Sequence, residues 1–144
     1  MGTTTFSGPV KAGSVRDGAS ANVGFVVMAQ TAAWTQSTTA ADTGIVIPAG
    51  SQVLDFEVQI ATACDGASQN LSVGTSATSN EFFSALALGT AADTVFFGSA
   101  GTITDMDTWA DVGATDVSVY VDFSAGSAGA GWITVSYVQA IDLA

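Results

Sequence analysis

The sequence predicts an all-β fold, an antiparallel β-sandwich or jelly roll with an extended N-terminal arm. Several segments alternate apolar and polar residues with the period of two that is typical of a half-buried strand. Clusters of Gly, Ser, Asp and Asn separate these segments at the spacing of short antiparallel strands. Charged residues make up only 10% of the chain, so Thr, Ser, Asn and Gln must supply most of the polar surface.

The chain is expected to form one domain preceded by an arm. Its 144 residues suffice for a single hydrophobic core. Residues 1–20 show no periodicity and are rich in glycine, so we expect them to extend outside the sandwich. The sandwich itself is predicted to span residues 21–144.

The clearest strand is predicted at residues 52–62. There the apolar residues Leu54, Phe56, Val58 and Ile60 alternate with the polar residues Asp55, Glu57 and Gln59. This alternation predicts that the first set faces the core and that the second faces solvent.

Two further segments, 116–123 and 131–141, show the same alternation. Weaker strand candidates are residues 22–30, 43–48, 70–74 and 93–98. One segment, residues 79–88, instead has Phe82, Phe83 and Leu86 at helical spacing, and predicts a helix of at most two turns.

The charge distribution excludes several kinds of partner. The net charge is −11, and the only two cations are Lys11 and Arg16. Two cations cannot form a nucleic-acid interface, and an acidic chain is repelled by an anionic membrane surface. The longest apolar runs are too short to cross a bilayer, and no secretory signal is visible. A single cysteine excludes an internal disulfide, so synthesis in a host cytoplasm is expected.

Few residues of the chain could perform catalysis. With no histidine, the Ser–His–Asp and Cys–His mechanisms and most zinc sites are excluded. Asp55 and Glu57 are a carboxylate pair of the kind a glycosidase uses, although an acidic strand face explains them better. Cys64 has no basic neighbour in the sequence and is expected to be structural. We expect no enzymatic activity and no cofactor.

A loop at residues 105–111 is a weak candidate for a cation site. Its carboxylates are Asp105, Asp107 and Asp111, but it lacks the glycine and the closing glutamate of an EF-hand loop. The alternative is a solvated loop that Trp109 anchors to the core.

Three aromatic residues are expected at the surface. Trp34 lies in a Thr/Ala-rich stretch, whereas Tyr120 and Trp132 fall on the polar sides of their strands. Exposed aromatic side chains favour a subunit or docking interface. The other reading is that both faces of the sandwich are locally covered and that these rings are buried.

The order of several short motifs resembles small virion proteins of tailed bacteriophages. The matching segments are "IPAGS" (47–51), "DG" (65–66), "LSVGTS" (71–76), "EF" (81–82) and the closing hairpin "DVSVYVDFSAGSAGAGWITVSYVQA" (116–140). The opening "TTTFSGPVKAG" is also similar to the first residues of phage structural proteins. The resemblance covers roughly residues 3–12 and 44–140. The sequence departs from the pattern at "ACDG", where an aromatic is common in place of Cys64, and at "SATSN", which replaces an Asp-Pro turn.

This resemblance implies a head decoration, or cement, protein that binds the exterior of the phage head, or a related head-fibre base that docks on the capsid. It implies contacts with the major capsid protein and with other copies of the chain, often in a trimer. The arm would contribute contacts through Phe6, Val10, Lys11 and Arg16, and the sandwich through Trp34, Tyr120 and Trp132. A carbohydrate-binding or adhesion module is the alternative, with Trp34, Trp109 or Tyr120 stacking on sugar rings.

Overall fold

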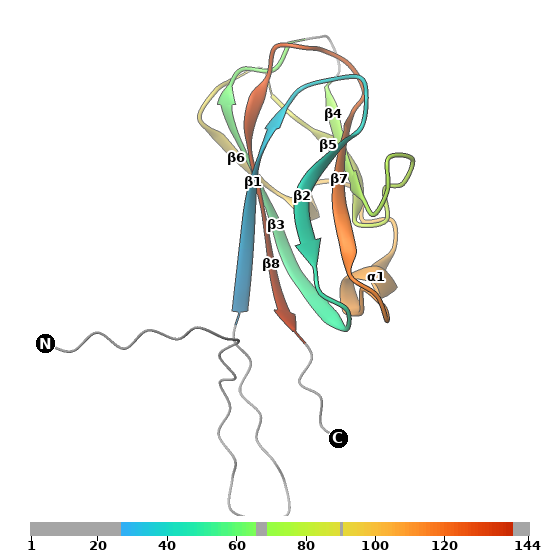
Figure 1. Ribbon diagram of the computed structural model, residues 1–144. Coiled ribbons are helices and arrows are strands. Elements are labelled where there is room, and N and C mark those ends of the chain that lie inside the picture. The colour runs from blue at the N-terminus through green and yellow to red at the C-terminus, as the bar shows by residue number, and fades with distance from the viewer. Residues whose placement is uncertain (1–26, 66–68, 90, 140–144) are drawn as a thin grey trace, which may run out of the picture.

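The computed structural model describes residues 27–65, 69–89 and 91–139, which form two antiparallel four-stranded sheets packed face to face (Figure 1). Sheet A has the strand order β1-β8-β3-β6, and sheet B has the order β2-β7-β4-β5. The predicted all-β sandwich is therefore confirmed, whereas the arm at residues 1–20 lies outside the described residues. The strands are β1 (Val27–Thr35), β2 (Ala41–Ile47), β3 (Ser51–Thr62), β4 (Asn70–Gly74), β5 (Phe83–Ala87), β6 (Thr94–Phe97), β7 (Val117–Phe123) and β8 (Ala130–Gln139).

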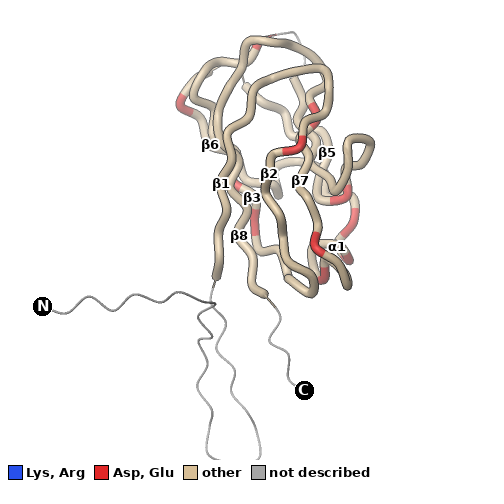
Figure 2. Tube along the Cα trace, in the orientation of Figure 1, with Lys and Arg blue, Asp and Glu red and all other residues tan. Residues whose placement is uncertain are grey.

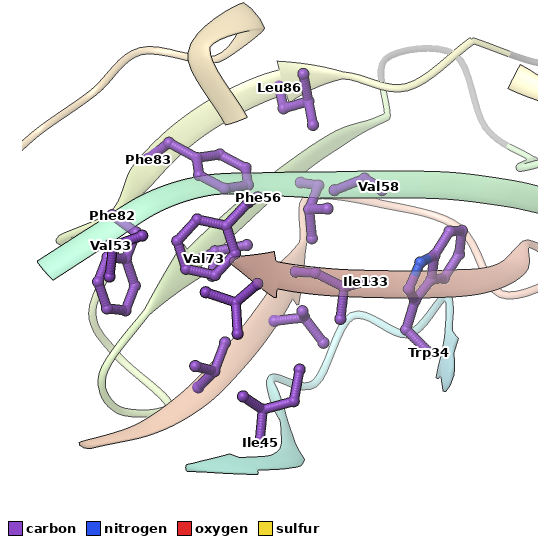
Figure 3. Close-up of a cluster of buried hydrophobic side chains, with 14 of the residues drawn as sticks. Trp34, Ile45, Val53, Phe56, Val58, Val73, Phe82, Phe83, Leu86 and Ile133 are labelled. Atoms are coloured by element: carbon purple, nitrogen blue, oxygen red, sulfur yellow. The ribbon is translucent and has the colours of Figure 1, made fainter. Parts of the chain in front are cut away.

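Side chains from the inner faces of both sheets form one core (Figure 3). Val58 and Ile60 of β3 and Ile133 of β8 are fully buried on the sheet A side, and Val73 and Val119 on the sheet B side. Burial alternates along these strands because successive side chains point to opposite faces of a sheet. The periodicity in the sequence thus identifies the core-facing residues of most strands.

Aromatic rings concentrate near one end of the core. The ring of Phe56 lies 4.9 Å from Phe82, 5.7 Å from Phe83 and 5.6 Å from Trp109, measured between centroids. These tilted and edge-on arrangements suit the charge distribution of aromatic rings. Trp34 lies well away from Phe82 and Phe83 (Figure 3), and its ring centroid is 5.1 Å from that of Phe123.

A β-bulge corrects the predicted orientation of Leu54. Val53 pairs with Tyr137 and Asp55 pairs with Ser136, so β3 has one extra residue at this point. Val53 is consequently buried, while Leu54 is exposed. The prediction that Leu54 faces the core was wrong because a bulge shifts the alternation by one residue.

The predicted helix at residues 79–88 is also wrong, because Phe83–Ala87 forms strand β5. Ala85 has a φ of 54°, and the pairing with β4 shifts between Leu71 and Val73. This bulge turns both Phe83 and Leu86 inward. Their spacing of three residues imitates the spacing of a helix face.

The α-helix that the structure does contain is short and was not predicted. Helix α1 spans Met106–Ala110, and a single 3-10 turn, η1 (Gly98–Ala100), follows β6. Trp109 of α1 is buried, and its indole nitrogen donates a hydrogen bond of 2.7 Å to the carbonyl oxygen of Phe82. The expectation that Trp109 anchors this loop to the core is confirmed. No helix within the described residues is long and apolar enough to span a bilayer.

Gln30 connects the two sheets where β1 and β2 lie at their edges. Its side-chain nitrogen donates to the carbonyl oxygen of Val46 (2.6 Å) and to the hydroxyl of Tyr137 (2.8 Å), and its oxygen accepts from the Val46 amide (3.3 Å). The edge of β2 therefore has its backbone groups satisfied by a side chain at this point, which reduces its capacity to pair with another strand.

Candidate interaction surfaces

The sequence-predicted contact residues fall into four different places. Phe6, Val10, Lys11 and Arg16 lie outside the described residues. Trp34 does not lie at the surface: only 4% of it is exposed, and its side chain packs between the sheets. The expectation of an exposed anchor at Trp34 is corrected, because β1 turns this ring inward together with Ala32 and Met28.

Tyr120 and Trp132 lie on opposite sides of the molecule. Tyr120 is on the outer face of sheet B, where it pairs with Asp42 of β2 and Gly74 of β4. Trp132 is on the outer face of sheet A, where it pairs with Ala33 of β1 and Gln59 of β3. These two rings cannot belong to one flat contact surface.

The outer face of sheet A carries an unusual number of exposed apolar side chains. We define the sheet A face as the outward side chains of β1, β8, β3 and β6. Within the described residues, five of the seven large apolar side chains that are exposed lie on it: Val27, Leu54, Val95, Phe97 and Trp132. Most of the remaining positions are small or neutral, for example Ala33, Thr31 and Thr134.

Register places the largest of these side chains close together. Trp132, Gln59 and Val95 are neighbours across β8, β3 and β6, and Phe97 follows Val95 two residues later on the same face. Neighbouring strands are about 4.8 Å apart, so Trp132 on β8 and Phe97 on β6 lie about 10 Å apart across the sheet, on either side of Gln59 and Glu57. Phe97 is 51% exposed and Trp132 is 44% exposed.

Only two carboxylates interrupt the sheet A face. Glu57 lies between Thr134 and Phe97 in the register, and Asp55 lies beside Ser136. One oxygen of Asp55 accepts a hydrogen bond of 2.8 Å from the amide of Phe56. The candidate carboxylate pair therefore lies on an open sheet surface, next to each other on one strand rather than on facing walls as a glycosidase requires.

The other carboxylates lie elsewhere on the molecule (Figure 2). Asp42 and Asp122 are exposed on the outer face of sheet B, on strands that flank or carry Tyr120. A second group lies at or near α1: Asp105, Asp107, Asp111 and Asp116. The described residues contain no Lys or Arg, so none of these charges is neutralised within the described part of the chain.

In the candidate cation loop, the carboxylate of Asp105 caps a helix. Asp105 precedes α1, and its carboxylate accepts hydrogen bonds from the Asp107 amide (3.0 Å), the Thr108 amide (3.3 Å) and the Thr108 hydroxyl (2.8 Å). The Thr108 hydroxyl and amide and the Asp107 amide lower the pKa of Asp105. Asp111 accepts from the Gly113 amide (2.8 Å). Across residues 27–65, 69–89 and 91–139, no three His, Cys, Asp or Glu side chains gather where they could hold a metal ion.

Glu81 organises the loop between β4 and β5. Its carboxylate accepts a hydrogen bond of 3.0 Å from the amide of Thr75. Partial burial raises the pKa of Glu81, but hydrogen bonds from the Ser79 hydroxyl and the Thr75 amide outweigh it, and the net shift is downward. The carboxylate of Glu81, like that of Asp105, accepts hydrogen bonds from residues of its own loop.

Cys64 is buried, and its thiol is free. Burial raises its pKa, and the neighbouring charge of Asp65 raises it further. A thiol with a raised pKa is a poor nucleophile at neutral pH, which agrees with the structural role expected from the sequence.

Sequence reasoning missed most of the sheet A face. Val95 and Phe97 lie in the segment 93–98 that was only a weak strand candidate, and Leu54 was assigned to the core. The alternation in "TVFF" does distinguish Val95 and Phe97 from Thr94 and Phe96. It does not show which pair faces out, because three of the four residues are apolar.

Comparisons with known proteins identify the fold. No family model matches the chain, and no curated protein matches it. The solved structures that match include a chain of the acidic stable capsid of Helicobacter pylori bacteriophage KHP30 (TM-score 0.53, 16% identity), one of the cyanophage Pam1 capsid (0.58, 16%) and one of the capsid of Ralstonia phage GP4 (0.59, 19%).

The matches extend over nearly the whole of both partners. They cover 79%, 94% and 91% of this chain and 88%, 100% and 92% of the KHP30, Pam1 and GP4 chains respectively. The matched chains are therefore about as long as this one. The resemblance to virion proteins of tailed phages is confirmed at the level of fold: this chain has the β-sandwich fold of a small chain found in each of three phage capsids.

Proposed function

We propose that this protein is a capsid decoration protein that binds the outer surface of a bacteriophage head and stabilises it. The observation that carries the proposal is the shared fold over nearly the full length of three capsid chains of similar size. Eight antiparallel strands divided equally between two sheets also support the finer description as a jelly roll, a fold used by capsid proteins.

The distribution of aromatic side chains favours this function over sugar binding. The carbohydrate alternative expects Trp34, Trp109 or Tyr120 to stack on sugar rings, and aromatic rings that line one exposed groove would favour it. Trp34 and Trp109 are buried, while Tyr120 and Trp132 lie on opposite faces of the sandwich. The exposed apolar residues instead spread over a flat sheet face, which suits contact with another protein.

A structural role also fits the state of the carboxylates. Asp105 and Glu81 are held by backbone and hydroxyl donors, while Asp55 and Glu57 lie on an open face. A general acid needs a pKa raised by an apolar wall or by a second carboxylate. The shifts in Asp105 and Glu81 run in the opposite direction.

We further propose that residues 1–20 form an arm that contacts the shell or a neighbouring copy. The only two cations of the chain, Lys11 and Arg16, lie in this segment, while all the acids except Asp17 and Asp142 lie in the described body. Exposed charge pairs contribute only about 0–1 kcal/mol each, so Phe6 and Val10 must add apolar contacts. Repetition in a trimer multiplies these weak contacts.

Co-sedimentation with phage shells that lack the protein tests the proposed function. The full chain is expected to pellet with the shells and to raise the temperature at which they break. A variant that lacks residues 1–18 is expected to stay folded, because the described sandwich begins at Val27, and to lose shell binding. A full chain that fails to bind any shell would contradict the proposed function, and a truncated chain that binds at full strength would contradict the arm.

A further inference from the structure

We infer that copies of this chain associate with one another through the sheet A face. The inference deepens the proposed function, on which it rests for the expectation of self-assembly, by assigning the surface that the copies share. It commits to a second copy of the chain as the occupant of this face. The shell is then contacted by other parts of the molecule.

The first argument is the concentration of exposed apolar area. Val95, Phe97 and Trp132 lie in adjacent register positions, and Val27 and Leu54 extend the apolar surface toward the other end of the sheet. Gln59 and Glu57 of β3 lie between Trp132 on β8 and the pair Val95 and Phe97 on β6, whereas Ala33 lies on the other side of Trp132. Burial of such a patch removes apolar surface from water, although the side chains of Gln59 and Glu57 are buried with it.

The second argument is electrostatic. Every charged side chain in the described body is a carboxylate, so two copies repel each other in most orientations. The repulsion is smallest where the fewest carboxylates face each other. Sheet B presents Asp42 and Asp122 beside Tyr120, and the α1 end presents a group of four aspartates. The sheet A face also presents two carboxylates, Asp55 and Glu57, so charge disfavours the α1 end, and the exposed apolar side chains distinguish sheet A from sheet B.

The area of the face is sufficient. Strands β1, β8, β3 and β6 have 9, 10, 12 and 4 residues, and at about 3.3 Å per residue and about 4.8 Å per strand they project onto roughly 550 Å². The accessible surface of a textured face exceeds its projection, and stable complexes bury about 800 Å² on each partner. Aromatic residues near the centre of such an interface carry most of its binding energy, which gives Trp132 and Phe97 the largest expected effects.

The experiment measures the mass of the full chain and of five variants by sedimentation equilibrium over a wide range of concentration. Wild type is expected to form an oligomer. Trp132→Glu and Phe97→Glu place a carboxylate in the apolar patch and are each expected to weaken association by at least about 30-fold. The matched control Tyr120→Glu adds the same charge to sheet B and is expected to leave the association constant unchanged. Thermal unfolding of each monomer verifies that the variants are folded.

A fourth variant tests the same surface by a gain of affinity. Glu57→Gln removes the carboxylate that lies beside Phe97 and is expected to tighten association severalfold, because one like charge no longer has to be brought against a second acidic copy. The Asp122→Asn control removes a carboxylate of sheet B and is expected to have a smaller effect. Equal tightening by both variants would show general charge repulsion and overturn the assignment of the face.

Two outcomes separate this inference from the proposed function. If Trp132→Glu and Phe97→Glu remain oligomeric, or if wild type is a monomer throughout, the assignment of the sheet A face is wrong, whatever the shells show. If association follows the predicted pattern while wild type fails to bind shells, the face is right and the decoration function is wrong.

Discussion

Gln36 and Asp65 hold each other by a reciprocal pair of hydrogen bonds at one end of the sandwich. The side-chain nitrogen of Gln36 donates to the carbonyl oxygen of Asp65 (3.0 Å), and the Asp65 amide donates to the side-chain oxygen of Gln36 (3.1 Å). Gln36 also bonds Ala125 and Gly129, so one buried side chain joins the segments that follow β1 and β3 to the loop before β8.

Replacement of Gln36 by leucine is expected to lower the free energy of unfolding by about 2–4 kcal/mol. The substitution introduces an apolar side chain of similar size and leaves the amides of Asp65 and Gly129 without their acceptor. Urea unfolding followed by tryptophan fluorescence measures the change. Gln52→Leu, at an exposed position of β3, is the control and should change stability by less than about 0.5 kcal/mol. Equal effects of the two substitutions would show that the Gln36 bonds contribute little.

The hydrogen bonds of the Asp65 carboxylate make the stability of the fold depend on pH in the acid range. Its carboxylate accepts from the amides of Ser127 (2.6 Å) and Ala128 (3.0 Å), and these bonds lower its pKa. A lowered pKa in the folded state stabilises the fold above the pKa of the unfolded chain, about 3.9, and this contribution disappears as the pH falls through the folded value.

The stability difference between wild type and Asp65→Asn is therefore expected to be constant at neutral pH and to shrink below about pH 4. Unfolding titrations at a series of pH values measure it. Asp42→Asn serves as a control because the carboxylate of Asp42 accepts a local hydrogen bond, from the Gly44 amide two residues away (2.8 Å). A difference for Asp65→Asn that grows as the pH falls would contradict the assigned bonds.

The bulge in β5 predicts opposite effects of glycine at two nearby alanines. Ala85 has a positive φ, which costs an L-residue about 1–2 kcal/mol and costs glycine almost nothing. Ala85→Gly is expected to stabilise the protein by up to about 1 kcal/mol. Ala87→Gly in the same strand should destabilise it by about 0.5–1 kcal/mol, because glycine has more backbone freedom to lose there. Two changes of the same sign would contradict the positive φ of Ala85.

Trp109 is expected to contribute more to stability than its position in a five-residue helix implies. Trp109→Ala removes an edge-on contact with Phe56 and the hydrogen bond to Phe82, and should cost about 3–5 kcal/mol. Trp109→Phe keeps a ring but no donor and should cost about 1–3 kcal/mol. The exposed Met106 of the same helix provides the control, since Met106→Ala should have little effect. A loss for Trp109→Phe as large as that for Trp109→Ala would assign the whole effect to the hydrogen bond.

The sequence determined the fold class and most strands, because local alternation reports directly on burial at one face. The periods in residues 52–62, 116–123 and 131–141 correspond to β3, β7 and β8. These properties depend on residues that are close together in the chain.

Tertiary structure alone decided which residues share a surface. The bulges at Leu54 and Ala85 depend on the register with partner strands, and they reversed the expected side of Leu54 and turned a predicted helix into β5. The assignment of β7 and β8 to different sheets placed Tyr120 and Trp132 back to back, and pairing of β3 with β6 brought Phe97 beside Glu57. Strand pairing joins residues far apart in the chain, so no local pattern encodes it.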